Sequence, residues 1–178
     1  MTGWRARAAD LDARATLALS GWLDGAPPRR ARVARLGMGL WTRTGDSLLW
    51  LAIGVLAWRF GTGFWARLGE HVVLATALAW CASTILKYLI RRPRPEGAGG
   101  RFFADFDPHA FPSGHAARAG ALFVAVGVLL PWWGALLLLC WAVSVAISRV
   151  VLGLHHAADV GVGLVIGALV GALLLLLL

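Results

Sequence analysis

The stretch AGALFVAVGVLLPWWGALLLLCWAVSVAI, residues 119–147, contains no charged side chain. A helix needs about 20 apolar residues to cross the hydrocarbon core of a bilayer, so this stretch is too long for a single span. Pro131–Gly134, which reads PWWG, divides it near the middle. The stretch therefore predicts a hairpin of two membrane-spanning helices, at roughly 114–130 and 132–149.

The composition of the whole chain agrees with a membrane protein. Hydrophobic side chains make up 59% of its 178 residues, and the mean hydropathy is +0.72. Soluble domains are usually about 45–50% apolar. Only helices and closed barrels satisfy their backbone hydrogen bonds in lipid, and the alternating pattern of barrel strands is absent. We therefore expect an all-α integral membrane helix bundle that forms one domain over residues 1–178.

Three further apolar stretches predict spans at roughly 46–62, 71–89 and 157–178, which gives five spans in all. Residues 1–45 are too polar to cross the membrane. Apolar residues recur there at helical spacing, Ala-Pro-Pro at 26–28 interrupts them, and a second, basic amphipathic piece follows. Both pieces predict interfacial helices that lie on the membrane surface. The alternative is a pair of ordinary amphipathic helices packed on the transmembrane bundle of residues 46–178.

The positive charges are distributed unevenly between the two faces that five spans would create. Fifteen of the 17 Lys and Arg residues fall in the segment 1–45, the loop 87–118 and the turn 149–156, which share one face. The positive-inside rule places that face in the cytoplasm, for a protein of the plasma or inner membrane. If residues 11–23 crossed the membrane instead, the same face would point outward.

Three polar clusters lie at this face: Lys87–Pro95, Pro112–His115 and Ser148–Asp159. Their common position in depth predicts a single site. Lys87, Arg94 and Arg149 would surround a dianion such as phosphate, since guanidinium forks match phosphate oxygens and a Lys adds a point charge. The alternative is that these cations only extend from the span ends toward water.

Pro112 is suited to the entry of a helix, which puts Ser113 and Gly114 at the helix start. Free backbone N–H groups and the helix dipole make such a start an anion site, which Gly114 lets an anion approach closely. His115 would face the anion from the first turn. The alternative is that Ser113 is no more than an N-cap of this helix.

His155 and Asp159 are four residues apart, which would place them one above the other on a helix. The carboxylate could then fix the tautomer of the imidazole and leave the other ring nitrogen free to attack. A buried structural pair is the alternative. A metal site built from His109, His115, His155, His156 or Asp159 is not expected, because no metal-binding motif occurs and the cations would repel a divalent ion.

Together the three clusters resemble the signature of the type 2 phosphatidic acid phosphatase (PAP2) family. That signature is Lys-x6-Arg-Pro, then Pro-Ser-Gly-His, then Ser-Arg-x5-His-x3-Asp, and residues 87–159 match it in full. The resemblance implies a metal-independent phosphatase without a cofactor, in which His155 forms a phosphohistidine, Asp159 orients it and His115 acts as acid and base. It also implies the residues that hold the phosphoryl oxygens: Lys87, Arg94, Ser113, Gly114 and Arg149.

The stretches around His115 and His155 look closest to the polyisoprenoid diphosphate phosphatases of the family. Phosphatidate or phosphatidylglycerophosphate hydrolysis by the same residues is an alternative, and a lipid-phosphate binder without turnover is another. Arg118 would reach a second phosphate, or pair with Asp159 or a loop acid. The expected partners are a lipid phosphate and the bilayer, not nucleic acid. The glycine pattern at 163, 167 and 171 favours close helix contact inside the bundle over an oligomer contact, and it leaves the oligomeric state open.

Overall fold

The computed structural model describes residues 3–95 and 107–178, and the regular elements in these ranges are helices. This confirms the predicted all-α class. Along the chain the helices are α1 (Gly3–Ser20), the short 3-10 helix η1 (Gly21–Leu23), α2 (Pro28–Arg43), α3 (Ser47–Phe60), α4 (Phe64–Ile90), α6 (Gly114–Gly127), α7 (Trp132–Val151) and α8 (Ala157–Leu177).

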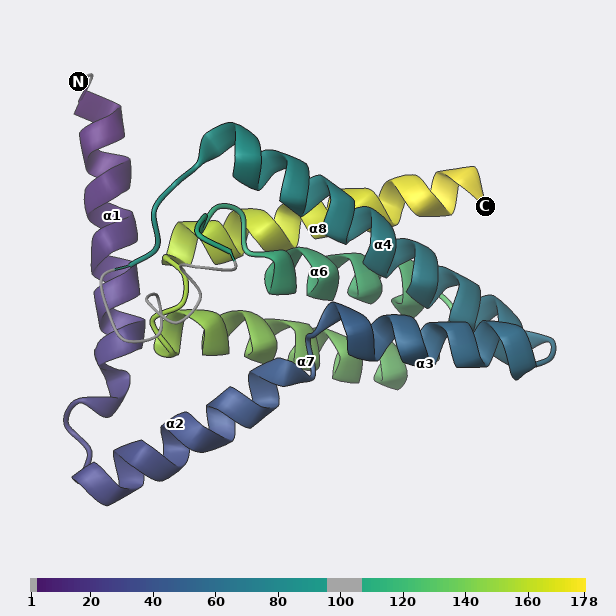
Figure 1. Ribbon diagram of the computed structural model, residues 1–178, viewed down its shortest axis with the longest axis horizontal. Coiled ribbons are helices and arrows are strands. Elements are labelled where there is room, and N and C mark those ends of the chain that lie inside the picture. Colours follow the sequence, from purple (N-terminus) through teal and green to yellow (C-terminus); the bar gives the residue numbers. More distant parts are fainter. Residues whose placement is uncertain (1–2, 96–106) are drawn as a thin grey trace.

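Each of the five predicted apolar stretches corresponds to one helix, from α3 to α8. Helices α4, α7 and α8 are long and apolar enough to cross a bilayer. Helices α3 and α6 contain 14 residues each. The five helices run side by side, with the end of α4 and the starts of α6 and α8 at the end that α1 crosses (Figure 1). We call this the site end of the bundle.

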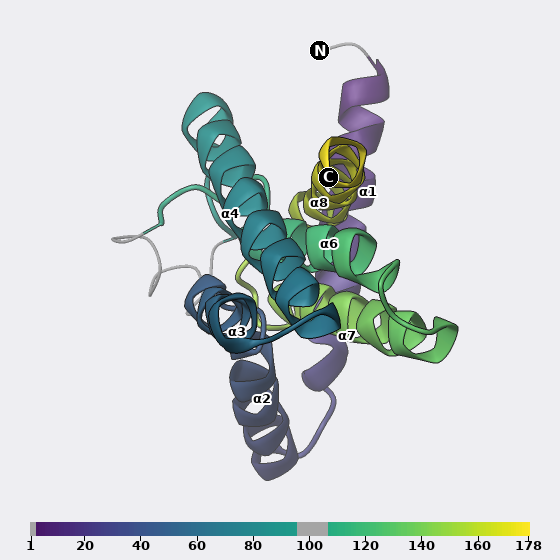
Figure 2. The same ribbon diagram turned by 90° about the vertical axis from the view of Figure 1, so that its right-hand side faces the viewer.

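Helix α6 is the centre of the bundle. Viewed along the helices, it lies among α4, α7 and α8 (Figure 2). Its alanines are fully buried, and Leu122 is among the largest side chains with no exposed surface. The small side chains of α6 allow α4, α7 and α8 to pack closely against it. The residues at the start of α6 are therefore held by contacts from several helices.

Helix α8 approaches α6 through glycines. A Cβ added to Gly167 would lie 1.8 Å from the carbonyl oxygen of Ala117, and one added to Gly163 would lie 2.7 Å from that of Ser113. On α6, a Cβ at Gly120 would lie 2.4 Å from the carbonyl oxygen of Leu164. The predicted use of the glycine pattern, which is packing inside the bundle, is therefore confirmed.

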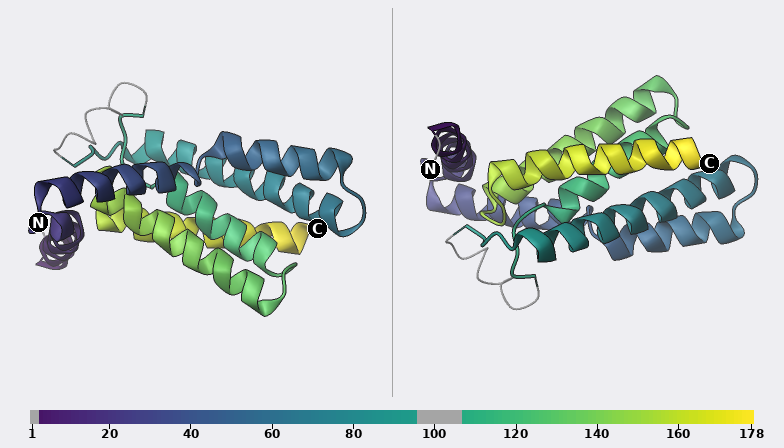
Figure 3. Two further views of the ribbon diagram at one scale, coloured as in Figure 1. Left: turned by 90° about the horizontal axis from the view of Figure 1, so that it is seen from below. Right: turned by 90° about the horizontal axis from the view of Figure 1, so that it is seen from above.

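Helix α1 crosses the site end and packs there through polar side chains (Figures 1 and 3). The Thr16 hydroxyl accepts a hydrogen bond from the Ala157 N–H at 2.9 Å, and the Asp12 carboxylate accepts one from the Ala158 N–H at 2.8 Å. Two orphan donors at the start of α8 are thus satisfied from α1. Leu11 and Leu17 of α1 are exposed, whereas Leu19 packs against a buried cluster that includes Ala116 and Val150.

The glycine contact predicts a sharp difference between two substitutions in α8. Gly167→Ala should lower the free energy of unfolding in detergent by about 2 kcal/mol or more, because the new methyl group overlaps backbone atoms of α6. Gly161→Ala is the matched control, since nothing lies within 4 Å of a Cβ at that position. Thermal unfolding of both variants measures the difference. Equal stability of the two variants would contradict this packing.

Candidate active site

A cavity of about 340 Å³ opens at the site end, where α4 and α7 end and α6 begins. Its walls come from four segments that are distant in sequence: the start of α3, the end of α4 with the following loop, the start of α6, and the end of α7 with the turn before α8. The side chains around it are Ser47, Trp80, Ser83, Thr84, Lys87, Tyr88, Arg94, Asp107, Gly114, His115, Arg118, Arg149 and His155.

Seven of the nine predicted site residues line this cavity. The two others, Ser113 and Asp159, are fully buried beside it, and the Ser113 N–H donates a hydrogen bond to the Asp159 carbonyl oxygen at 2.9 Å. The three sequence clusters are therefore brought together in one place, as their shared depth predicted.

The start of α6 has the features of an anion site. Ser113 is the N-cap residue, yet its side chain makes no capping bond. Its hydroxyl oxygen is buried and has no hydrogen-bond partner among the residues that the structure describes. A buried hydroxyl without a partner is unfavourable by about 1–3 kcal/mol, so this group is suited to a ligand. The alternative role of Ser113 as a simple N-cap is therefore wrong.

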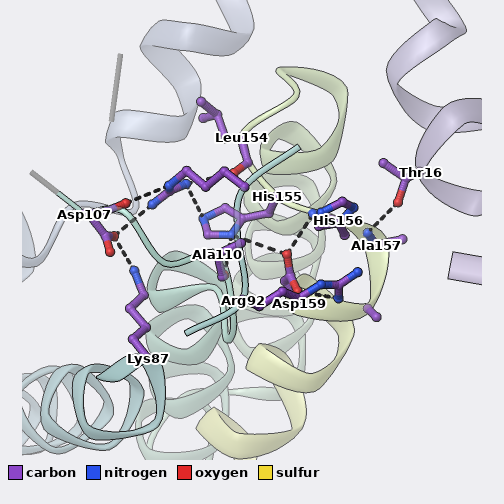
Figure 4. Close-up of polar contacts among 12 residues, drawn as sticks. Thr16, Lys87, Arg92, Asp107, Ala110, Leu154, His155, His156, Ala157 and Asp159 are labelled. Atoms are coloured by element: carbon purple, nitrogen blue, oxygen red, sulfur yellow. Dashed lines mark hydrogen bonds and ion pairs between the residues drawn. The ribbon is translucent and has the colours of Figure 1, made fainter. Parts of the chain in front are cut away.

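Two of the cations share a carboxylate that the sequence did not reveal. Asp107 accepts hydrogen bonds from Lys87 and, at 2.9 Å, from Nη2 of Arg94 (Figure 4). Nε of Arg94 also donates to the Asp107 carbonyl oxygen at 2.8 Å. The sequence signal for this contact was an acidic residue in a basic loop. The spacing along the chain did not indicate which Lys or Arg side chain it would pair with.

The hydrogen bonds of His155 define its tautomer. Nδ1 lies 2.7 Å from the Ala110 carbonyl oxygen, which only accepts, so Nδ1 carries the proton. Nε2 lies 3.3 Å from Nη1 of Arg94, which only donates, so Nε2 presents its lone pair. The same Arg94 nitrogen donates to the Leu154 carbonyl oxygen at 2.7 Å. The ring thus exposes an unprotonated nitrogen to the cations of the cavity.

The surroundings of His155 also keep it neutral. Burial lowers the pKa of His155 well below its ordinary value, and the charges of Arg149 and Arg94 lower it further. A neutral imidazole with a free lone pair is the form that a nucleophile requires.

The predicted placement of His155 on the same helix as Asp159 is wrong. Helix α8 begins at Ala157, so His155 lies in the turn before it, and Asp159 is the third helical residue. The Asp159 carboxylate accepts from the His156 N–H at 2.9 Å and from Nη1 of Arg92 at 2.8 Å. Its Oδ2 lies 4.0 Å from Nδ1 of His155 (Figure 4). In this structure the hydrogen bond from Nδ1–H of His155 goes to the Ala110 carbonyl oxygen and not to Asp159. The orienting role of Asp159 stays a prediction.

Arg118 lines the cavity, but its hydrogen bonds go to groups other than the predicted acids. Its guanidinium donates to the Gly45 carbonyl oxygen and to the Ser47 hydroxyl, at the junction between α2 and α3. Among residues 3–95 and 107–178, Arg118 is paired with neither Asp159 nor the loop acid Asp107, while the loop acids Glu96 and Asp105 lie outside the described residues. Contact with a second phosphate stays a prediction.

The remaining histidines have other contacts. The His109 ring packs edge-on against Tyr88, with centroids 5.7 Å apart, and His156 caps the start of α8. No group of three or more His, Cys, Asp or Glu side chains arranged for a metal ion occurs within the described ranges.

The fold and the cavity define a class: a helical membrane protein with a cation-lined anion site that holds two histidines. Residues 70–178 match the family model of the PAP2 superfamily. The chain therefore belongs to the PAP2 superfamily, and it is a phosphatase of that family. This confirms the family and the enzyme class that the three sequence motifs indicated.

Several named proteins are similar to this chain. The lipid A 1-phosphatase of Rhizobium etli is 30% identical, over 80% of this chain and 70% of the relative. The decaprenylphosphoryl-5-phosphoribose phosphatase of Mycobacterium tuberculosis is 34% identical, over 61% and 58%. The putative undecaprenyl-diphosphatase YbjG of Escherichia coli is 30% identical, over 65% and 59%. The two last matches span less than two thirds of those relatives.

Two solved structures share the fold. LpxE of Aquifex aeolicus has a TM-score of 0.72 at 20% identity, with 93% of this chain and 94% of the other covered. The transmembrane PAP2 type phosphatidylglycerolphosphate phosphatase of Bacillus subtilis has a TM-score of 0.74 at 24% identity, with 94% and 84% covered. The second of these is named as transmembrane, and both share the helical fold of this chain.

Removal of the Ser113 hydroxyl should separate stability from anion binding. In Ser113→Ala the ligand-free protein should be as stable as the wild type or more stable, because a buried unpartnered hydroxyl is lost. Inhibition by orthovanadate, a phosphate analogue, should weaken about tenfold, since a hydrogen bond to a charged ligand contributes about 1.5–3 kcal/mol. Ser20→Ala, at a half-buried serine outside the cavity, is the control. Unchanged vanadate inhibition would show that Ser113 does not bind the anion.

Proposed function

We propose that this protein is a metal-independent lipid phosphatase that removes phosphate from polyisoprenyl phosphates or diphosphates through a phosphohistidine on His155. The observation that carries the proposal is the neutral His155, whose Nε2 lone pair faces a cavity shared by four cations and His115. The surrounding charge favours a phosphate group, and the ring nitrogen is ready to attack it.

In the proposed first step, Nε2 of His155 forms a bond to phosphorus as the bond between phosphorus and the leaving oxygen breaks. His115 gives a proton to that oxygen. In the second step, water attacks the phosphohistidine, His115 takes a proton from the water, and the N–P bond breaks to release phosphate. Pre-placed donors that stabilise the developing charge are worth several kcal/mol in such transfers. The proposed donors are the side chains of Lys87, Arg94, Arg149 and Ser113 and the Gly114 N–H.

A lipid substrate is supported by an apolar groove beside the cavity. The groove has a volume of about 700 Å³ and is lined mainly by α3 side chains with Ala77 and Trp80 of α4. It shares Ser47 and Trp80 with the cavity. A phosphate in the cavity would thus have an apolar path next to it for a hydrocarbon tail.

The polyisoprenyl substrate is supported by two of the relatives, whose names specify decaprenyl-linked and undecaprenyl substrates. Lipid A is a second candidate, because the lipid A 1-phosphatase match covers 80% of this chain. Phosphatidate and phosphatidylglycerophosphate are a third class, which the same site chemistry would accept.

Phosphate release in the presence of EDTA tests the proposal. The detergent-purified protein should hydrolyse farnesyl or undecaprenyl diphosphate faster than lipid A or phosphatidate, and His155→Ala should lower the rate by at least about a thousandfold, since the nucleophile is lost. Preference for lipid A or phosphatidate would overturn the substrate and keep the mechanism. Turnover that His155→Ala retains, or that EDTA abolishes, would overturn the mechanism.

We also propose that the site faces the cytoplasm, because most of the positive charge lies at the site end. A tag placed at residue 2 should then be inaccessible to a membrane-impermeant reagent in intact cells and become accessible after permeabilisation. A tag in the 131–134 turn, at the opposite end of the bundle, is the control and should show the reverse. Labelling of residue 2 in intact cells would reverse the orientation.

A further inference from the structure

The junction between α2 and α3, residues Thr44–Ser47, lies against the start of α6 and brings a carboxylate to the second histidine of the cavity. Oδ1 of Asp46 lies 2.9 Å from Nε2 of His115. An ionised carboxylate only accepts hydrogen bonds, so Nε2 carries a proton and donates it. Asp46 and His115 are 69 residues apart in sequence, and nothing in the motif spacing joins them.

The junction is held in place by hydrogen bonds from three sides. Arg118 donates to the Gly45 carbonyl oxygen and to the Ser47 hydroxyl, which are the two neighbours of Asp46. The indole N–H of Trp50 donates to the Thr44 carbonyl oxygen at 2.7 Å, and that of Trp141 donates to the Thr44 hydroxyl at 2.9 Å. The carboxylate is therefore positioned before any substrate binds.

The His115 ring packs directly on the junction backbone. A Cβ added to Gly45 would lie 3.0 Å from Cδ2 of His115 and 2.9 Å from Cγ1 of Val145. The absence of a side chain at residue 45 thus allows the imidazole to reach Asp46.

The Asp46 carboxylate does little else. It is the N-cap residue of α3, yet its side chain makes no capping bond. The hydrogen bond from His115 holds the pKa of Asp46 below its ordinary value, although partial burial opposes this, so the group is ionised at neutral pH. The other charges that act on His115 are those of Arg118 on its own helix and Arg149 on α7, both positive. Asp46 supplies the negative charge that opposes them.

We propose that Asp46 is a positioning residue for His115: a carboxylate that fixes the imidazole ring and stabilises its protonated form. The inference rests on the proposed function, in which His115 is the acid and base. It also assigns the working nitrogen. Because Nε2–H is held by Asp46, Nδ1 of the imidazolium gives its proton to the leaving oxygen, and Nδ1 of the neutral ring takes a proton from water in the second step.

A double-substitution cycle tests this role. Asp46→Asn, which keeps the size of the side chain and removes its charge, should lower kcat by about 10- to 100-fold, within the range of general acid–base contributions. KM should change less than kcat, because Asp46 does not line the phosphate cavity, although it lines the adjoining groove. In the His115→Ala background the same substitution should cause almost no further loss, since its effect passes through His115. Asp24→Asn, at an exposed ion pair with Arg35, is the matched control.

An equal loss of kcat in both backgrounds, or an unchanged kcat in Asp46→Asn alone, would overturn the proposal.

Proton NMR of the imidazole N–H groups provides a test that does not need turnover. The wild type should show a downfield N–H signal, which is assigned to His115 by its absence in His115→Ala. This signal should move upfield in Asp46→Asn and vanish in Asp46→Ala. If the wild type lacks that signal, the role of Asp46 is wrong, even if the enzyme is active. If the signal is present but no lipid phosphate is hydrolysed, the proposed function is wrong and the contact between Asp46 and His115 stands.

Discussion

The high free-energy cost of a charged group without a partner next to lipid governs this structure. The arginines at the site end avoid that cost, because they donate hydrogen bonds to groups on other elements. Arg92 joins Asp12 of α1 to Asp159 of α8, Arg94 joins Asp107 to the turn before α8, and Arg118 joins α6 to the junction before α3. The side chains that would hold a phosphate thus also connect the helices, so the site and the bundle end depend on one set of interactions.

The sequence was sufficient for the helices and for most of the site. Uncharged runs and their breaks located the apolar helices, because the length of a span and the cost of charge in lipid leave few alternatives. Three motifs with fixed spacing identified six residues that line the cavity. What could not be predicted are the contacts between distant segments, such as Asp107 with Lys87 and Asp46 with His115. Those contacts depend on the packing of α6 against its neighbours, which spacing along the chain does not encode.

The pair His155 and Asp159 shows how a spacing rule depends on the local structure. A separation of four residues places two side chains on one helix face only if both residues are helical. Here Gly153 adopts a left-handed conformation with φ of +67°, the chain turns, and His156 becomes the cap of α8. His155 is thereby free of the helix and can turn its ring toward Arg94, a direction that a position inside α8 would not give it.

The polar contact of α1 with the start of α8 has a consequence for biosynthesis. Thr16 and Ala157 are 141 residues apart, so the turn that carries His155 receives its support from a helix that is made long before it. Contacts of such long range form late, because a long loop must close first. In a nascent chain in the membrane, the turn that carries His155 therefore stays without this support until α8 has been made and has met α1.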